Sequence, residues 1–445
     1  MEIYLTILFG WLAGLVVGIV PGIGMGGLLL ILYPFLFNLD ILQLFVFYIV
    51  CITSCQYYGQ ISGIIYGVPG DITALPAVKY GHPLHLQGKG AELLSATATA
   101  SLLGSVIAMF FFYLMSKNLE ILFLFFDNTV KTMYLTLAVM ILIFLSENKM
   151  LSLLLAFFGL LIGQIGYNGL ISAHIFVKPA TILDSGIPFS PMFLGFLIIP
   201  TLLYHYKKVK GKKSNISFFN LTIKKRTQML FSNNNFTSIL RGSMLGSIIG
   251  LIPGASYAIC SNIAATLEQK FLKNCSAKQR DFSTVVSAES ANNAGSITVL
   301  IPLIFLALPI IPSEAIMFSI VEAKGFGYTV SFDFVKEQAM YLLSIIIVIN
   351  LFNWLFAGYY YTVLGNLYVY LQKIIYPVII TSLIIIFGAI AFYNNQLFLS
   401  LIVFVLSFVA GMIIKNESVK MILIFCFFLS DILFAEYYRF YILQF

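Results

Sequence analysis

Charged residues are scarce in this chain. Only 10% of its 445 residues are Asp, Glu, Lys or Arg, whereas 60% are hydrophobic and the mean hydropathy is +0.97. A water-soluble fold of this length needs far more charge to cover its surface, so a soluble globular protein is excluded. Apolar runs of about 20 residues recur along the chain, each long enough to cross the ~30 Å hydrocarbon layer of a bilayer. The composition therefore predicts an all-α polytopic membrane protein.

Cysteine and histidine are also few, and this limits metal and redox chemistry. The chain has five cysteines without a CxxC pair, and four histidines. Cys51 with Cys55, or His82 with His85, offers only two ligands, so we expect no metal site. The phosphate-binding pattern GxxxxGK[ST] is missing, as are paired intramembrane aspartates, since Asp71 has no second acid beside it. We therefore expect neither an enzyme nor a bound cofactor.

The basic residues are concentrated in one stretch. Residues 207–238 hold eight Lys or Arg and no acid, so the rest of the chain carries 17 basic groups (25 − 8) against 18 acidic ones. By the positive-inside rule this stretch is a cytoplasmic linker rather than a nucleic-acid site. It separates a first transmembrane repeat, 1–206, from a second, 239–445. The chain opens without a basic signal-peptide region, so we expect the first span to be retained.

The apolar runs predict about 10–12 membrane segments. In the first half they lie at roughly 3–37, 41–66, 92–115, 119–146, 150–170 and 189–206. In the second half they lie at roughly 239–271, 287–310, 338–357, 359–392, 396–414 and 419–440.

The first segment of each half carries the same spaced residues. A shift of 232 residues (253 − 21) places five residues of one half on five identical residues of the other. They are Gly10, Gly14, Gly18, Pro21 and Gly22, which fall on Gly242, Gly246, Gly250, Pro253 and Gly254. Such agreement in one register indicates that the halves are repeats. Glycines four apart also suit close helix packing, but packing alone does not explain a Pro-Gly pair inside a span.

These two segments are too long for one simple crossing. As a single helix, 239–271 would be about 48 Å long. Arg241 near its start and Lys270 near its end place both flanks on the cytoplasmic side, whereas Glu2 and Asp40 flank 3–37 without any basic residue. We therefore expect inverted repeats with two re-entrant hairpins, folded back at the Pro-Gly pairs. A long, tilted and kinked helix is the alternative.

Polar residues crowd the span that follows each expected hairpin. The second half has "SAESANNAGSITVLIPLIFLALP", with Glu289, Ser290, Asn292 and Asn293 at its start. The first half has "TSCQYYGQISGIIYGVPGD", which includes Ser62 and a further break at Pro69-Gly70. Buried in hydrocarbon such groups cost several kcal/mol, so we expect them to face protein or water.

Several of these stretches identify a family. The chain resembles the large permease subunit of the tripartite tricarboxylate transporters through motifs that cover most of residues 14–315, while its C-terminal third adds only hydrophobic spans. The motifs are "PGIG" at 21–24, "YYGQISGIIYGVPG" at 57–70, "GHPLHLQGKG" at 81–90, "RGSMLGSIIGLIPGAS" at 241–256 and "ESANNA" at 289–294. The resemblance implies a permease of the bacterial inner membrane that imports a carboxylate with Na⁺ or H⁺. It also implies two partners, a small four-span membrane subunit and a periplasmic solute-binding protein.

The chain departs from the family pattern close to the expected site. Gly59-Gln60 stands where the family usually has Gly-Gly, and Asp71 replaces a Gly-Thr or similar pair. Tyr80-Gly81 replaces Asp-Gly, and the late Pro-Gly-Ser is "PIIPSEA", 309–315, in this chain. These changes favour a distant member with another ligand.

The expected mechanism uses the helix breaks themselves. Free backbone N–H groups at the starts of half-helices carry partial positive charge and suit a carboxylate. The candidate substrate-binding residues are Pro21, Gly22, Gly24, Ser62, Pro69, Gly70, Pro253, Gly254, Ser256, Ser290, Asn292 and Asn293. Glu289 would repel an anion until a cation or proton neutralised it, which makes it the candidate coupling residue. The plainer interpretations are a helix cap or lysine pair for Glu289, and helix–helix hydrogen bonds for the asparagines. A channel, or a transporter of a neutral solute, is the alternative function.

Overall fold

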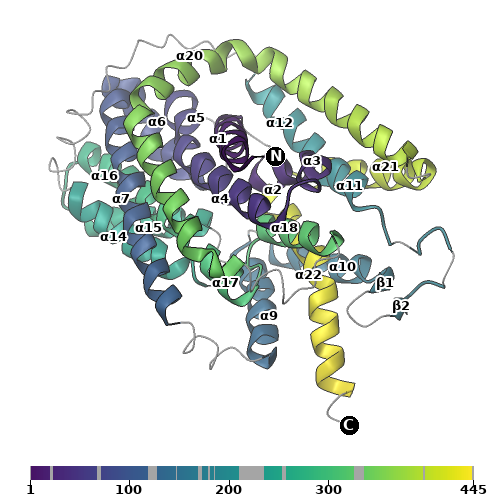
Figure 1. Cartoon of the computed structure of the whole chain (residues 1–445). Coiled ribbons are helices and arrows are strands. Elements are labelled where there is room, and N and C mark those ends of the chain that lie inside the picture. The colour runs from purple at the N-terminus through teal and green to yellow at the C-terminus, as the bar shows by residue number, and fades with distance from the viewer. Residues whose placement is uncertain are drawn as a thin grey trace.

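The computed structural model is built of helices that surround two long buried ones, α4 and α16 (Figure 1). It describes residues 2–20, 24–67, 72–118, 128–146, 148–168, 173–178, 181–184, 186–209, 235–252, 257–324, 335–393 and 396–442. The elements of the first half are α1 (Ile3–Ile19), α2 (Gly24–Ile31), α3 (Tyr33–Leu36), α4 (Ile41–Tyr58), α5 (Gln60–Tyr66), η1 (Ile72–Ala74), η2 (Ala77–Gly81), α6 (His82–Leu84), η3 (His85–Lys89), α7 (Gly90–Lys117), α9 (Asn128–Leu145), α10 (Lys149–Gly163), β1 (Gly166–Asn168), β2 (Ala173–Ile175), α11 (Phe189–Phe193), η4 (Leu194–Ile198) and α12 (Ile199–Val209). Those of the second half are α14 (Asn235–Ile249), α15 (Tyr257–Phe271), α16 (Ala277–Thr298), α17 (Leu300–Leu306), α18 (Pro312–Ala323), α20 (Ala339–Tyr393), α21 (Leu397–Ile413) and α22 (Glu417–Ile442).

The two central helices begin at defined caps and are buried on all sides. Asp40 caps α4, since its side chain accepts from the Gln43 backbone N–H at 2.8 Å while the Gln43 side chain bonds back to Asp40. Ser276 caps α16 with a single bond, since its hydroxyl accepts from the Gln279 backbone N–H. These bonds satisfy backbone donors that a helix start leaves free. Every residue of α4 from 44 to 58 and of α16 from 282 to 298 is buried, so neither helix presents a face to lipid.

The glycines of the first half seat α1 directly on α4. A Cβ atom at Gly14 would lie 2.4 Å from the Cys51 carbonyl oxygen, and one at Gly18 would lie 2.7 Å from the Cys55 oxygen. Both distances are shorter than any real contact, so only glycine permits this approach of two backbones. Since the contacts advance together along both helices, α1 and α4 run in parallel.

The glycines of the second half seat α14 on α16 in the same manner. A Cβ atom at Gly242 or Gly246 would lie 2.2 Å from the carbonyl oxygen of Ser287 or Ala291, so these helices also run in parallel. The next helix, α15, returns along α16 in the opposite direction. Its residue Cys260 lies against Gly295, whereas residue 269, further along α15, bonds at 3.0 Å to residue 284, earlier in α16.

The arms α14 and α15 therefore form a helical hairpin, as the fold-back expected within 239–271 requires. Its open end is closed by an ion pair, with Arg241 Nη2 at 2.5 Å from Glu268 Oε1. The Ser238 hydroxyl donates to the same oxygen at 2.6 Å. The side of the membrane from which the hairpin enters stays a prediction.

The central helix of each half continues into a short second helix with matching backbone. Residues Gly59 and Val299 join the two pieces with φ/ψ of −59/−27° and −60/−27°. The short helices α5 and α17 each span seven residues and end on a left-handed residue, Gly67 (φ 61°) or Ala307 (φ 56°). A shift of 240 residues (307 − 67) relates the two units, which supports the repeats inferred from the glycines.

The two units run in opposite directions. Near the start of α4, the Tyr48 hydroxyl lies 3.0 Å from Ser313, which follows α17. At the other end, Ile64 in α5 and Val285 near the start of α16 both lie against Gly81. The start of one unit therefore meets the end of the other, which is the geometry that inverted repeats require.

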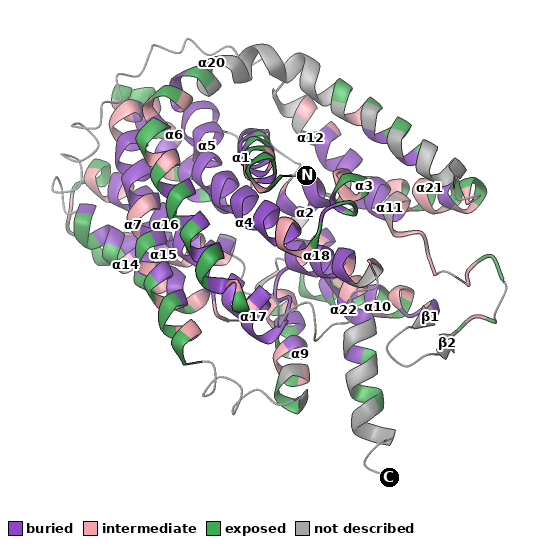
Figure 2. Cartoon of the chain, viewed as in Figure 1, coloured by how far each residue is buried: buried purple, intermediate pink, exposed green. Residues whose placement is uncertain are grey.

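Large apolar residues are exposed on many of the described helices, as a bilayer requires. Figure 2 shows where the exposed residues lie along the chain. Within the described residues, three helical stretches are long and apolar enough to cross a membrane: Ile41–Tyr66, Ala77–Lys117 and Ala339–Val363. Exposed apolar residues line one face of α1, opposite its glycines, and most of α21. On these two helices they are Leu5, Leu8, Leu12, Val16, Leu397, Phe398, Leu401, Ile402, Val405, Leu406, Val409, Met412 and Ile413.

The C-terminal part departs from the expected segments. The segment expected at 338–357 corresponds to the apolar stretch Ala339–Val363. Its predicted separation from a segment at 359–392 is wrong, because α20 is one helix of 55 residues that arches over the other helices (Figure 1). Gly358 alone does not end a helix whose neighbours all favour one. After α10 the chain forms a small antiparallel hairpin, β1 with β2, where an apolar segment was expected to continue to residue 170. Most of the basic linker lies outside the described residues, and the division into two repeats by residue number stays a prediction.

Candidate functional site

Most of the helix-break residues assigned to substrate lie outside the described residues. They are Pro21, Gly22, Pro69, Gly70, Pro253, Gly254 and Ser256, and their roles stay predictions. The flanking residues are described and show that the helices stop there. After the first Pro-Gly pair a new helix, α2, begins at Gly24. This glycine has φ +60°, and no atom lies within 4 Å of the position that a Cβ would take. That left-handed backbone and open space suit glycine, so neither 3–31 nor 235–271 is one unbroken helix.

The elements that follow the breaks pair crosswise between the repeats. In one pair α18 lies on α2, where a Cβ at Gly26 would lie 3.3 Å from Ile316 Cδ1. In the other pair η1 lies on α15, where the Ser261 hydroxyl donates to the Thr73 carbonyl at 2.9 Å. Because α18 corresponds to η1 and α2 to α15, each repeat supplies one member of both pairs. Residues of α2, α15, α18 and η1 all belong to one buried cluster, and we call the part of it between these elements the shared region.

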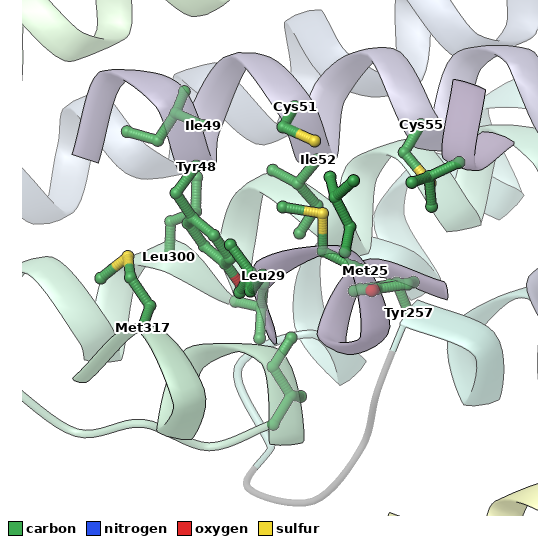
Figure 3. Packing of buried hydrophobic residues seen from close by; sticks show 14 of the residues in the cluster. Met25, Leu29, Tyr48, Ile49, Cys51, Ile52, Cys55, Tyr257, Leu300 and Met317 are labelled. Carbon is green, nitrogen blue, oxygen red and sulfur yellow. The ribbon is translucent and has the colours of Figure 1, made fainter. Parts of the chain in front are cut away.

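The packing around this region is drawn in Figure 3, which shows residues of both repeats in one buried cluster. Met25 is the second residue of α2, the arm after the first break, and Tyr257 is the first residue of α15, the arm after the second hairpin's break. Tyr48 of α4 and Met317 of α18 belong to the same cluster. All four side chains are buried, so the described walls of this region are closed to solvent.

One break is fully described, and it is the break that follows α17. Ala307 adopts the left-handed conformation without being glycine, and Leu308 N–H donates back to the Pro302 carbonyl at 3.0 Å. The backbone N–H of Ile310 donates at 2.8 Å to Glu314 Oε2. Glu314 is 0% exposed, and its Oε1 has no hydrogen-bond partner among the described residues.

Residues of two other helices lie near Glu314. The Tyr48 hydroxyl of α4 bonds to Ser313, the residue before Glu314. The Tyr134 hydroxyl of α9 donates to the carbonyl of Leu251, which lies just before the second hairpin's break. Both phenols lie near enough to interact electrostatically with Glu314. The carboxyl group is thus beside the tip of the second hairpin and within the shared region.

Glu289 and Asn292 place two unsatisfied oxygens on one face of α16. Glu289 is 2% exposed and Asn292 is 1% exposed, and the two side chains hydrogen-bond with each other. Glu289 Oε2 and Asn292 Oδ1 have no partner within the described part of the chain. Glu289 is neither a helix cap, since α16 begins at Ala277, nor part of an ion pair with any described residue. Buried acceptors in this state suit a proton or a hard cation.

The structure ties Ser290 and Asn293 into contacts between helices. The Ser290 hydroxyl lies 2.6 Å from that of Ser243 on α14 and donates to the Ile239 carbonyl at 3.0 Å. The Asn293 amide donates at 2.9 Å to Ser101 on α7. These bonds agree with the plainer interpretation, in which both side chains hold neighbouring helices together.

Ser62 has a local bond as well. It lies in α5, where its buried hydroxyl donates to the Gly59 carbonyl one turn earlier at 3.2 Å. The structure therefore does not bring Ser62, Ser290 and Asn293 together as one ligand set. Their assignment to substrate stays a prediction.

Sequence reasoning missed the polar residues of α20, because it assigned only hydrophobic spans to this part of the chain. Asn353 Oδ1 accepts from both Trp11 Nε1 at 2.9 Å and the Tyr58 hydroxyl at 3.0 Å. Gln60 donates at 2.8 Å to the Tyr361 hydroxyl. The signal was available, since an amide inside an apolar run is costly unless it has a partner.

Comparison with known proteins gives one family match. The family model described as "Tripartite tricarboxylate transporter TctA family" matches residues 4–425 of this chain. It therefore covers both hairpins, both central units and the first third of α22.

A curated protein sequence is also similar to this chain. A protein of Agrobacterium vitis described as "Uncharacterized 52.8 kDa protein in TAR-I ttuC' 3'region" is 24% identical over 318 residues. The aligned part is 69% of this chain and 61% of that protein, so the similarity spans less than two thirds of the relative's length. No solved structure matches the chain.

Proposed function

The chain belongs to the tripartite tricarboxylate transporter TctA family, and from this membership we propose that it is the large membrane permease of a binding-protein-dependent secondary transporter. It imports a carboxylate together with Na⁺ or H⁺. Family membership makes the protein a transporter and not an enzyme, and its apolar helices make it a multi-pass membrane protein. The identities of the substrate, the coupling ion and the partner proteins are what we propose.

The crosswise pairing of broken helices carries the proposal. Backbone without helical hydrogen bonds is severely disfavoured in lipid unless it is buried in protein or lines a cavity. Here the described elements that flank the breaks of the two halves lie against each other, with α2 against α18 and α15 against η1. Transporters built from repeats use such paired breaks as their central site, where free N–H groups hold an anion.

Glu289 and Asn292 supply the coupling step. Their two unsatisfied oxygens accept a proton or Na⁺, and the neutralised carboxyl group no longer repels an arriving anion. The cation therefore binds before the substrate, or with it. An empty site keeps its charge, which disfavours entry of the anion alone and couples the two movements.

The partners follow from the family's three-part organisation. A periplasmic binding protein would deliver the carboxylate, and a small membrane subunit would complete the permease in the bacterial inner membrane. The described exterior of α1 and α21 is apolar, so the small subunit would meet an apolar surface there.

Uptake into cells or proteoliposomes tests this function. Labelled acetate, succinate and citrate are offered under an imposed Na⁺ gradient, an imposed H⁺ gradient, or neither, with and without the binding protein. Accumulation that requires one gradient and the binding protein supports the proposal. Flux of neutral solutes that follows only their own concentration difference would instead indicate a channel or a neutral-solute transporter.

Replacing Glu289 by Gln tests the coupling role. The substitution keeps the shape but removes the charge, so we expect uptake to lose its dependence on the cation gradient. Glu92→Gln is the matched control, because Glu92 is a surface acid paired with Lys89 at 2.7 Å on the same type of helix. Unchanged cation dependence in the Glu289 variant would assign this carboxyl group to packing.

A further inference from the structure

Glu289 and Asn292 leave two hydrogen-bond acceptors on one bonded pair of side chains. The two residues lie one turn apart on α16, and the Asn292 amide hydrogen-bonds to the Glu289 carboxyl group. Two atoms of the pair, Glu289 Oε2 and Asn292 Oδ1, have no partner within the described residues. A buried oxygen without a donor is costly, so this pair needs something that brings a donor to both oxygens.

One hydrogen atom satisfies both oxygens of the pair at once. An ionised carboxyl group only accepts hydrogen bonds, whereas its acid form carries an O–H donor. With the hydrogen on Oε2, the acid donates to Asn292 Oδ1 while the Asn292 amide donates to the carboxyl group, which closes a ring of two complementary hydrogen bonds. Burial favours the same form, because a neutral carboxyl group loses far less than a charged one when it leaves water.

A metal cation fits this pair less well than a proton does. Hard metal cations gather about six oxygen ligands, and the pair offers two. The neighbouring polar side chains of α16 are engaged elsewhere. Ser290 bonds to α14, Asn293 bonds to α7, and the Ser296 hydroxyl donates to the Asn293 carbonyl.

The charged and titratable groups on the elements packed against α16 have contacts of their own. Arg241 of α14 pairs with Glu268 of α15, and Lys89 pairs with Glu92 at the start of α7. The others bond or pack away from Glu289: Cys260 of α15 lies against Gly295, Tyr57 of α4 donates to the Ala98 carbonyl, Lys79 of η2 lies over the Tyr80 ring, and His82 of α6 bonds to the Ile64 carbonyl. Among the described groups, burial and Asn292 are what act on this carboxyl group.

The first repeat has isoleucines at the equivalent positions. The shift of 240 residues that relates α5 to α17 places Ile49 and Ile52 on Glu289 and Asn292. Both isoleucines are buried in the apolar cluster of Figure 3. The acid–amide pair is therefore an addition to the second repeat and no part of the shared backbone.

We propose that the coupling ion is a proton, one for each transported carboxylate, carried between Glu289 Oε2 and Asn292 Oδ1. This proposal rests on the proposed function. The proton comes from the water outside the cell, forms the Oε2–H bond, and leaves to the water inside the cell when the carboxylate is released. The loaded pair is neutral, so it does not repel the arriving anion.

Infrared spectra of the purified permease at neutral pH test the place of the proton. A protonated carboxyl group has a C=O stretching band apart from those of carboxylates and amides. We expect the difference between the wild type and Glu289→Gln to contain such a band. Asn292→Leu should shift the band to higher frequency, because the acid loses its acceptor. Ser287→Ala is the matched control and should leave the band unchanged, since Ser287 is buried on the same helix but lies against Gly242 of α14.

Proteoliposomes with the binding protein test the ion and its number. Labelled succinate or citrate is offered without Na⁺ under a pH gradient, at a membrane potential clamped to zero. One proton per carboxylate raises the ratio of inside to outside carboxylate by about tenfold per pH unit. Glu289→Gln keeps an N–H donor for Asn292 Oδ1 and so mimics the loaded pair. It should exchange labelled for unlabelled carboxylate but bring the ratio only to about one.

The outcomes separate this proposal from the proposed function. The proposal is overturned by a missing acid band, by a band that Asn292→Leu leaves in place or that added Na⁺ removes, by accumulation on a Na⁺ gradient alone, or by about hundredfold accumulation per pH unit. Carboxylate import stands in each of these cases. Failure to take up either acid under any gradient removes the proposed function, while the infrared bands still decide where the proton is held.

Discussion

Replacing Gly246 by Ala should push the second hairpin, α14 with α15, away from α16 and lower the stability of the folded protein. The new Cβ atom would lie 2.2 Å from the Ala291 carbonyl oxygen, against about 3.4 Å for an ordinary contact, so the two helices have to separate by about 1.2 Å. Backbone stands on both sides of this contact, and no side chain can rotate away. Overpacking of this kind costs about 1–3 kcal/mol, and we expect the upper end here.

The assay is the apparent unfolding temperature in detergent. Unfolding entropy of about 2.1 cal/mol/K per residue means that 1 kcal/mol corresponds to roughly 1 °C in a chain of 445 residues, so we expect a loss of about 3 °C. Gly14→Ala, whose Cβ would meet the Cys51 oxygen at 2.4 Å, should behave alike if the repeats are equivalent.

The control for this experiment is Gly388→Ala on α20. No atom lies within 4 Å of a Cβ at that glycine, and alanine favours a helix, so the variant should be as stable as the wild type or slightly more stable. If Gly246→Ala is as stable as Gly388→Ala, the close seating of α14 on α16 is not part of the folded protein. The argument for two matching hairpins would then fail with it.

Two further substitutions test buried polar contacts by the same unfolding assay. Arg241→Gln removes the ion-pair partner of the buried Glu268 carboxylate, which is 1% exposed, and leaves it the hydroxyl of Ser238; we expect the free energy of unfolding to fall by about 2 kcal/mol. Adding Glu268→Gln should restore part of this stability. Wild-type stability of the single variant would show that the ion pair does not stabilise the hairpin. Asn353→Ala removes the acceptor of both Trp11 and Tyr58 and should cost about 2–3 kcal/mol, whereas wild-type stability would show that α20 is not bound to the first repeat through this amide.

The positions of the hairpins could be predicted because backbone chemistry is local. Pro-Gly pairs interrupt helices wherever they occur, and glycines four apart make a flat helix face whatever lies against it. The shift of 232 residues between Gly246 and Gly14 therefore exposed the repeat without any knowledge of partners. The structure places both glycine faces on the central helices and stops both first helices before the Pro-Gly pairs.

The fourth break was harder to predict, because its sequence lacks the Pro-Gly pair that marks the other three. Pro309 is present, but Ala307 stands where Gly67 stands in the first half, and Ile310 stands where Gly70 does. Only the backbone conformation, with φ at 56° and 61°, shows the two as equivalent. Glu314 was overlooked for the same reason, since its significance depends on the N–H it meets.

Composition and spacing by themselves determined that this chain is a helical membrane protein, and they predicted two repeats with interrupted helices. These properties arise from the cost of exposing charge or free backbone to lipid, which each residue incurs wherever it stands. Only the tertiary structure decided which polar side chains have hydrogen-bond partners within the protein. Ser290 and Asn293 bond to neighbouring helices, and these partners come from distant parts of the chain. It leaves oxygens of Glu289 and Asn292 without a described partner, and no local pattern distinguishes these residues from the other two.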